Sequence, residues 1–149
     1  MKATRINNMT RNVSLGILTI MMIFLFTSCA RKMTFTISPV APAAQGDVKV
    51  KRDKNNNYVI KIEIINLAGI ERMQPSKQTY IVWMVTNEGL TKNIGQLISS
   101  TSFLSKKLKA SFETVSSFYP SKIFITAEEN ASTQYPGSKV VLSTDIIIE

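Results

Sequence analysis

Residues 78–86 read QTYIVWMVT, a nearly continuous apolar run that is rich in β-branched and aromatic residues. The run is too short for a typical buried helix, and its composition favours a strand. The residues Asn87-Glu88-Gly89 that follow it are typical of a hairpin turn. We therefore predict a central β-strand here, with the rest of the domain arranged around it.

Segments on both sides of this strand also have strand character. On the amino side, Val48–Lys51 and Tyr58–Asn66 alternate apolar and polar residues around an Asn-rich turn, which predicts a hairpin with one apolar face. A short first strand is expected at 34–38, and the Pro/Ala-rich residues 39–46 after it are interpreted either as a tether or as a bend. On the carboxyl side we expect strands at 91–98, 107–115, 122–127 and 139–148.

Seven or eight short strands with turn signals between them, and no long amphipathic helix, indicate an all-β domain. The expected fold is an antiparallel, immunoglobulin-like β-sandwich. The 149 residues are enough for one such domain and not for two.

Composition excludes several function classes. Three basic residues precede Cys29, so 15 basic residues stand against 10 acidic ones from Cys29 onward. This modest, spread-out excess suits an anionic membrane surface or simple solubility, and it does not predict nucleic-acid binding. With no histidine and one cysteine, the chain forms no internal disulfide and none of the usual imidazole or thiolate metal sites. We expect no metal and no dissociable cofactor.

The first 28 residues have the pattern of a secretory signal. Residues 1–12 are polar with three basic residues and no acidic one, and residues 13–26 are almost entirely apolar. About 14 apolar residues fall short of the roughly 20 that span a bilayer. The small residues Thr27 and Ser28 meet the requirement of a cleavage site.

Phe26-Thr27-Ser28-Cys29 resembles the lipobox of bacterial lipoproteins. The resemblance implies cleavage between Ser28 and Cys29, a diacylglycerol on the Cys29 sulfur and acylation of its amino group. Phe26 departs from the commonest Leu but is also large and apolar. Two or three acyl chains anchor a protein firmly where one holds only marginally. The alternatives are an ordinary signal peptide or an uncleaved membrane anchor with an incidental cysteine.

The residues after the cysteine bear on localisation and domain boundaries. Ala30 is not the Asp that marks inner-membrane retention in enterobacteria, and Arg31-Lys32 is unlike the acidic surface-export stretch of Bacteroidetes lipoproteins. By that resemblance we expect the periplasmic face of the outer membrane. The expected organisation is a signal peptide at 1–28, a lipid-anchored tether at 29–46 and the sandwich at 47–149.

A second resemblance concerns the domain itself and spans roughly residues 79–143. Its motifs are Tyr80-Ile81-Val82-Trp83, then residues 93–97, then residues 125–128 followed by Tyr135-Pro136-Gly137 and Val140-Val141-Leu142. In this order they look like the extracytoplasmic C-terminal domain of anti-sigma factor K and related proteins. Because a lipoprotein signal replaces the cytoplasmic and membrane-spanning segments of those regulators, the resemblance implies a fold and not transcriptional control.

The strongest candidate for a ligand or partner surface is Glu128, Glu129 and Asn130. Their oxygens suit a cation, but no calcium-loop spacing follows. Neighbours on a strand point to opposite faces, so the two carboxylates are not expected to work as an acid–base pair. The alternative interpretation is a solvated strand end.

Two further groups have a functional and a structural interpretation. Tyr80 and Trp83 either line a ligand patch or belong to the core. A set of basic residues either meets lipid phosphates or makes a solubilising face: Lys49, Lys51, Arg52, Lys54, Lys106, Lys107 and Lys109.

Together these features predict a membrane-anchored envelope lipoprotein without enzymatic activity, which acts as a binding or structural module. Its expected partner is an envelope protein or a glycan, engaged through loops or an edge strand. The alternative is an envelope sensor related to anti-sigma factor periplasmic domains. A hydrolase is the third hypothesis, and the absence of histidine and of a convergent acid pair argues against it.

Overall fold

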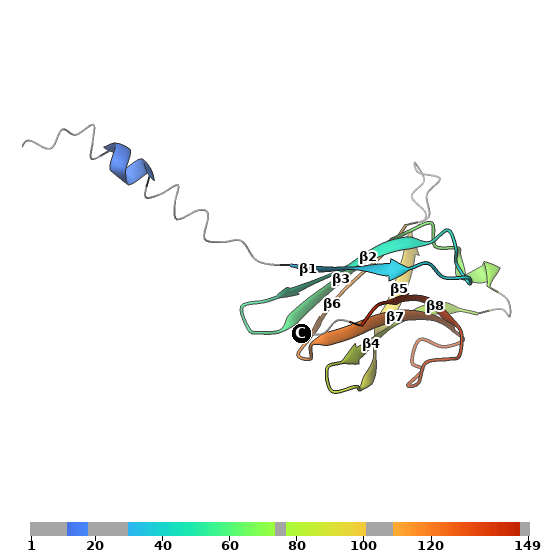
Figure 1. The fold of residues 1–149 in the computed structure, drawn as a ribbon. Helices are drawn as coiled ribbons and strands as arrows, with labels where there is room; N and C mark the ends of the chain where they lie inside the picture. The colour runs from blue at the N-terminus through green and yellow to red at the C-terminus, as the bar shows by residue number, and fades with distance from the viewer. Residues whose placement is uncertain (1–11, 18–29, 74–76, 101–108, 147–149) are drawn as a thin grey trace, which may run out of the picture.

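The computed structural model describes residues 12–17, 30–73, 77–100 and 109–146 (Figure 1). Residues 12–17 are helical, and Ile70–Arg72 form a 3-10 turn, η2. The strands of the described residues are β1 Arg31–Thr36, β2 Gln45–Arg52, β3 Tyr58–Ile65, β4 Thr79–Thr86, β5 Thr91–Ser100, β6 Lys109–Ser116, β7 Pro120–Glu128 and β8 Val140–Thr144. Among the described residues, no helix is both long enough and apolar enough to span a membrane.

The central run of the sequence forms β4, as predicted. β4 lies between β5 and β7, with Val82 opposite Gly95 on one side and Ile125 on the other. All its residues are buried except the half-buried Val85. The predicted hairpin around the Asn-rich turn is also confirmed, as β2 and β3.

The prediction of an immunoglobulin-like β-sandwich is wrong. The strands close into an antiparallel barrel in the order β1-β2-β3-β6-β5-β4-β7-β8. Closure depends on two strands that change partners along their length. β1 pairs with β2 through Arg31–Thr34 and with β8 through Phe35 and Thr36. β5 pairs with β4 through Thr91–Leu97 and with β6 through Ile98–Ser100. The two layers therefore share their corner strands, and the strands of the described residues form a closed ring.

β5 bends between its two partners at a bulge. Val82 faces Gly95 but Trp83 faces Asn93, which leaves Ile94 as the extra residue. Gly95 has a φ of 140°, and its N–H donates to Asn93 Oδ1 at 3.0 Å. A Cβ atom at this position would lie 2.7 Å from Cε2 of Phe112. The bend therefore requires glycine for both its backbone angle and its lack of a side chain.

We expect Gly95→Ala to lower the free energy of unfolding by about 1–3 kcal/mol, from backbone strain and contact with Phe112. Urea unfolding followed by circular dichroism measures the change. Gly89→Ala is the matched control, since Gly89 has a φ of 80° but open space around it. Equal losses in the two variants would show that the contact with Phe112 costs nothing.

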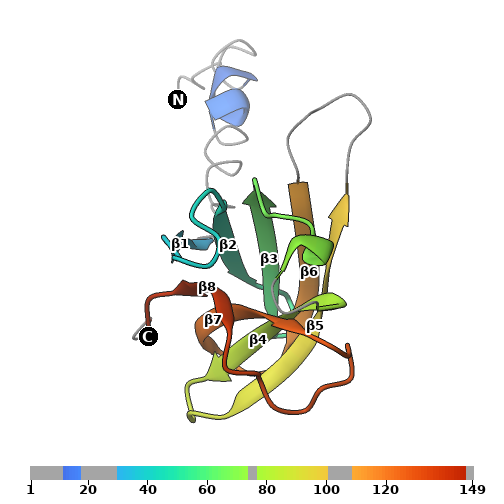
Figure 2. The same ribbon diagram turned by 90° about the vertical axis from the view of Figure 1, so that its right-hand side faces the viewer.

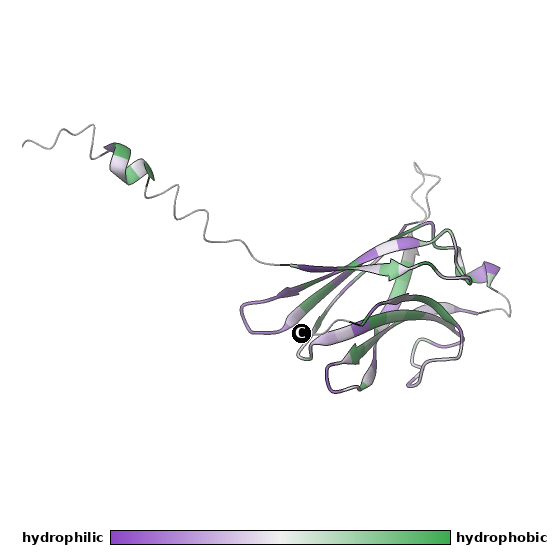
Figure 3. Ribbon diagram, viewed as in Figure 1, coloured by the Kyte–Doolittle hydropathy of each residue, from purple (hydrophilic) through white to green (hydrophobic). Residues whose placement is uncertain are grey.

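The core fills the inside of the barrel. Apolar residues at alternate positions along the strands point inward, and Figure 3 shows hydrophobic stretches on the strands with hydrophilic residues both on the strands and in the turns. Ile60, Ile62 and Ile64 of β3 are buried, while Lys61 and Glu63 between them are exposed. The inward residues of the other strands include Val48, Val50, Val82, Met84, Ile123, Ile125 and Leu142.

The segment expected as a tether or a bend contributes to the barrel. β1 begins at Arg31, three residues before the predicted first strand. After β1 the chain turns back through residues 37–44, of which Ser38, Ala41 and Ala44 are buried. Residues 31–44 therefore pack as part of the domain.

Candidate functional site

The outer face of β4 is covered by the connection from β7 to β8, residues 129–139. Trp83, on this face, is fully buried, stacks on Phe124 with ring centroids 6.3 Å apart, and donates its Nε1–H to Thr126 Oγ1 at 2.7 Å. The connection is held down by Asn93, whose Nδ2 donates to the carbonyl oxygens of Ala131 and Thr133 at 3.1 and 2.9 Å. Figure 2 shows this connection looping beside β4 and β5.

The three residues predicted as a ligand surface do not converge. Glu128 is buried and uses one oxygen, Oε1, to accept bonds from Thr126 Oγ1 at 2.5 Å and from the Gly137 N–H at 2.7 Å. Glu129 is exposed and pairs with Lys77 at 3.2 Å. Asn130 Oδ1 accepts bonds from the N–H and hydroxyl of Ser132. Glu128 thus joins Thr126 of β7 to Gly137 of the connection after β7, whereas Glu129 and Asn130 lie at the surface.

Glu129 and Asn130 instead line one wall of a small open pocket of about 290 Å³. Gln78 directly precedes β4, Thr79 is the first residue of β4, Gln96 comes from β5, and Ala131 completes the wall beside Asn130. Amide groups dominate this lining. No group of three His, Cys, Asp or Glu side chains suited to a metal ion occurs in the part of the chain that the structure describes.

Thr79 is the one residue of this pocket whose polar group is buried and unused. Its side chain is 5% exposed, and within the described residues its Oγ1 has no hydrogen-bond partner. Leaving a buried hydroxyl unpaired costs about 1–3 kcal/mol, so native proteins rarely do so without a reason. Its Oγ1 has no exposed surface in this structure, so a polar ligand in the pocket would reach the hydroxyl only after a rotation of the Thr79 side chain.

A larger groove of about 470 Å³ lies between β1, β2 and β3. Its acidic side chains are already paired within the protein: Asp47 with Lys32 at 3.0 Å, and Glu63 with Lys49 and Lys61 at 3.5 Å each. This groove therefore offers a ligand no comparable unpaired group, and the pocket at Thr79 is the better candidate.

Tyr80 and Trp83 belong to the interior and not to a ligand patch. Tyr80 is 3% exposed and donates its hydroxyl to the Ala68 carbonyl at 2.9 Å. Burial, with a smaller contribution from the Glu71 carboxylate, raises the pKa of Tyr80 to about 12 from its ordinary value of 10.0.

This shift predicts a specific alkaline weakening of the fold. The pKa of Tyr80 is higher in the folded protein than in the unfolded chain. Its contribution to the free energy of unfolding is therefore fully present below about pH 10 and is lost as the pH rises towards about 12. Urea unfolding at several pH values should show a smaller fall in stability over this range for Tyr80→Phe than for the natural chain. An identical fall in both proteins would contradict the assignment.

Gln78, Thr79 and Gln96 match no ligand-binding motif, and sequence reasoning did not predict any of the three as site residues. They resemble ordinary strand residues, and only the pairing of β4 with β5 brings Gln96 to the same side of the sheet as Thr79. The predicted lipidation and cleavage residues, Cys29 and Ser28, lie outside the described residues. The first described residue after them, Ala30, leads directly into β1.

Comparison of the chain with protein-family models, with curated proteins and with solved structures gave no match. The resemblances to a lipobox and to the anti-sigma factor K domain therefore rest on sequence motifs alone.

Proposed function

We propose that the mature chain is a lipid-anchored, non-enzymatic binding module of the bacterial envelope, and that its ligand is a hydroxyl-rich glycan held at the Thr79 pocket. The observation that carries this proposal is the buried Thr79 hydroxyl without a partner among the described residues. The lipobox-like sequence before Arg31 supports the anchor.

The lining of the pocket suits a sugar. Each amide of Gln78, Gln96 and Asn130 offers a donor and an acceptor, and Glu129 adds an acceptor. Vicinal sugar hydroxyls both donate and accept, so they match such a set. A protein partner would need a broader apolar centre than this small polar hollow provides.

The same lining argues for binding over hydrolysis. Glycoside hydrolysis normally uses two carboxyl groups that flank the scissile bond. Among the described residues that line the pocket, Glu129 is the only acid. The Glu128 carboxylate is buried and bonded to Thr126 and Gly137 instead. A bound glycan would meet no second carboxylate.

Binding is tested by calorimetric titration of the processed protein with disaccharide fragments of peptidoglycan. We expect saturable binding that Thr79→Val weakens about tenfold, since one lost hydrogen bond is worth about 1.4 kcal/mol. Gln96→Ala should weaken it similarly. The proposal would be contradicted by the absence of saturable binding, or by a Thr79→Val variant that binds as tightly as the natural chain.

Thr79→Val should also make the fold more stable, by about 1 kcal/mol, because a methyl group replaces an unpaired buried hydroxyl of the same size. Thr86→Val is the matched control on the same strand. Thr86 is buried, but its Oγ1 accepts a bond from the Leu90 N–H at 3.1 Å, so this variant should lose about 1 kcal/mol. Urea midpoints of the two variants that shift in the same direction would contradict the prediction.

The anchor is tested by Cys29→Ala in cells fed with labelled palmitate. We expect the label to disappear from the protein, since the chain has no other cysteine. Palmitate is the decisive readout, because an uncleaved signal can itself hold the precursor at the membrane. Undiminished labelling would rule out lipidation at Cys29.

A further inference from the structure

One end of the barrel collects the start of β1 and the turns after β2, β4 and β6. Arg31 lies opposite Val50, Arg52 opposite Tyr58, and Tyr58 opposite Ser116, so these segments meet at the same end. Thr86 opposite Pro120 adds the turn after β4. We call residues 31–32, 51–58, 87–92, 116–122 and 144–146 the basic end; it lies on the left of Figure 1, where the described chain enters the barrel.

The basic end carries seven basic residues and three acidic ones. Its basic residues are Arg31, Lys32, Lys51, Arg52, Lys54, Lys92 and Lys122. Within the described residues, only Lys32 of this set has a carboxylate within 4.0 Å, that of Asp47. The end is therefore a cationic surface whose charge is not neutralised by the protein itself.

Two of these cations are held in place by tyrosines. Arg31 Nη1 donates to the Tyr119 hydroxyl at 2.6 Å, and Arg52 Nη2 donates to the Tyr58 hydroxyl at 3.2 Å while its guanidinium lies 5.3 Å from the ring centroid. The two tyrosine rings meet edge to face, 5.4 Å apart. Each guanidinium has five N–H groups, so each keeps donors for an anion such as phosphate.

Apolar side chains project from the same end. Leu90 is 50% exposed in the turn after β4, Phe118 is 36% exposed in the turn after β6, and Ile146 is 71% exposed after β8. Exposed apolar groups among arginine, lysine and tyrosine are typical of surfaces that sit at the boundary between headgroups and acyl chains.

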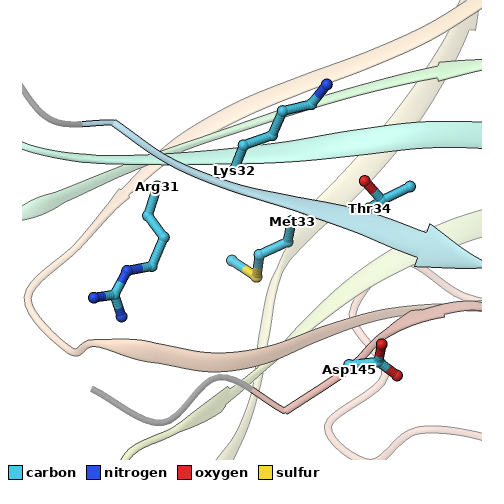
Figure 4. Close-up of a pocket in the computed structure, with 5 residues that line it drawn as sticks. All are labelled: Arg31, Lys32, Met33, Thr34 and Asp145. Atoms are coloured by element: carbon cyan, nitrogen blue, oxygen red, sulfur yellow. The ribbon is translucent and has the colours of Figure 1, made fainter.

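A hollow of about 230 Å³ lies at this end between β1 and the residues after β8. In Figure 4, Arg31 and Met33 extend from β1 on the side of Asp145, while Lys32 points the other way. A cationic group, a thioether and a carboxylate around one hollow suit a zwitterionic or anionic headgroup more than an apolar ligand.

Covalent geometry connects this end to the predicted lipid. Cys29 precedes Arg31 by two residues, and two residues of chain span at most about 7 Å. We propose that the basic end docks on an anionic phospholipid surface, with the Thr79 pocket at the opposite end facing away from it. The orientation rests on the lipid anchor proposed above and not on the identity of the pocket's ligand.

The experiment uses the processed, lipidated protein in vesicles of equal parts phosphatidylglycerol and phosphatidylcholine. Cys29 is blocked by lipid, so Leu90→Cys provides a single thiol for a fluorescent label at the basic end. Ala43→Cys provides the matched thiol at the far end, in the exposed turn between β1 and β2. Quenchers attached to the lipid acyl chains then report which label reaches the membrane. We expect strong quenching at position 90 and little at position 43.

Charge reversal separates docking from anchoring. Arg52→Glu with Lys54→Glu should reduce quenching at position 90 by about half or more, whereas Lys109→Glu, at the other end of the barrel, should leave it unchanged. Palmitate on Cys29 with equal quenching at both positions would overturn the orientation alone. Absence of palmitate would overturn the anchor and the orientation together.

Discussion

Trp83→Ala should lower the free energy of unfolding by about 3–5 kcal/mol, which is typical of removing a large buried aromatic side chain. Trp83 is fully buried on the outer face of β4 and is stacked on Phe124. The substitution removes this packing and leaves the Thr126 hydroxyl without its donor. Urea unfolding must be followed by circular dichroism, because the variant lacks the chain's only tryptophan.

Trp83→Phe is the informative control for that result. It keeps an aromatic ring beside Phe124 but removes the N–H that Thr126 accepts at 2.7 Å. We expect a loss of about 1–2 kcal/mol from the missing bond and the smaller ring. If Trp83→Ala cost less than about 1 kcal/mol, the outer face of β4 would not be a packed layer in solution.

Glu128→Ala should lower the free energy of unfolding by about 2–4 kcal/mol, because it removes the acceptor of the buried Thr126 hydroxyl and of the partly buried Gly137 N–H. The Thr126 hydroxyl and the Gly137 N–H both bond to Glu128 Oε1. The Gly137 bond ties the connection after β7 back to that strand, so its amide proton should also exchange much faster with solvent. Hydrogen exchange measured together with urea unfolding checks both effects.

Two neighbouring substitutions sharpen this test. Glu129→Ala removes an exposed carboxylate paired with Lys77 and should change stability by about 0.5 kcal/mol or less. Glu128→Gln keeps an oxygen that can accept both bonds, so it should recover most of the loss. Equal losses of stability in Glu128→Ala and Glu129→Ala would show that the bonds of Glu128 to Thr126 and Gly137 do not stabilise the fold.

The elements of this fold were largely predictable from local patterns. A strand alternates its side chains with a period of two, so Ile60, Ile62 and Ile64 identify an inward face without any knowledge of the neighbouring strands. The apolar run at β4 likewise identifies a strand that is covered on both sides. Turn residues such as those after β2 identify where the chain reverses.

Closure of the barrel was not predictable in this way. The strands of a sandwich and of a barrel show the same alternation, and what distinguishes them is the partner of each strand. β1 meets β8 through Phe35 opposite Thr144, residues more than a hundred positions apart. That pairing, and the bend of β5 at Gly95, depend on the packing of the whole domain.

The same division applies to function. The residues around Cys29 alone carry the prediction of a lipid anchor, because a processing signal is recognised as a linear motif. The tertiary structure decides the rest. It buries Glu128 against Thr126 and Gly137, and it brings Thr79, Gln96 and Glu129 into one pocket. It also places the cations and tyrosines together at the end where β1 begins. A ligand or a membrane meets side chains that are near one another in space, and that nearness is decided by strand pairing over long separations in sequence.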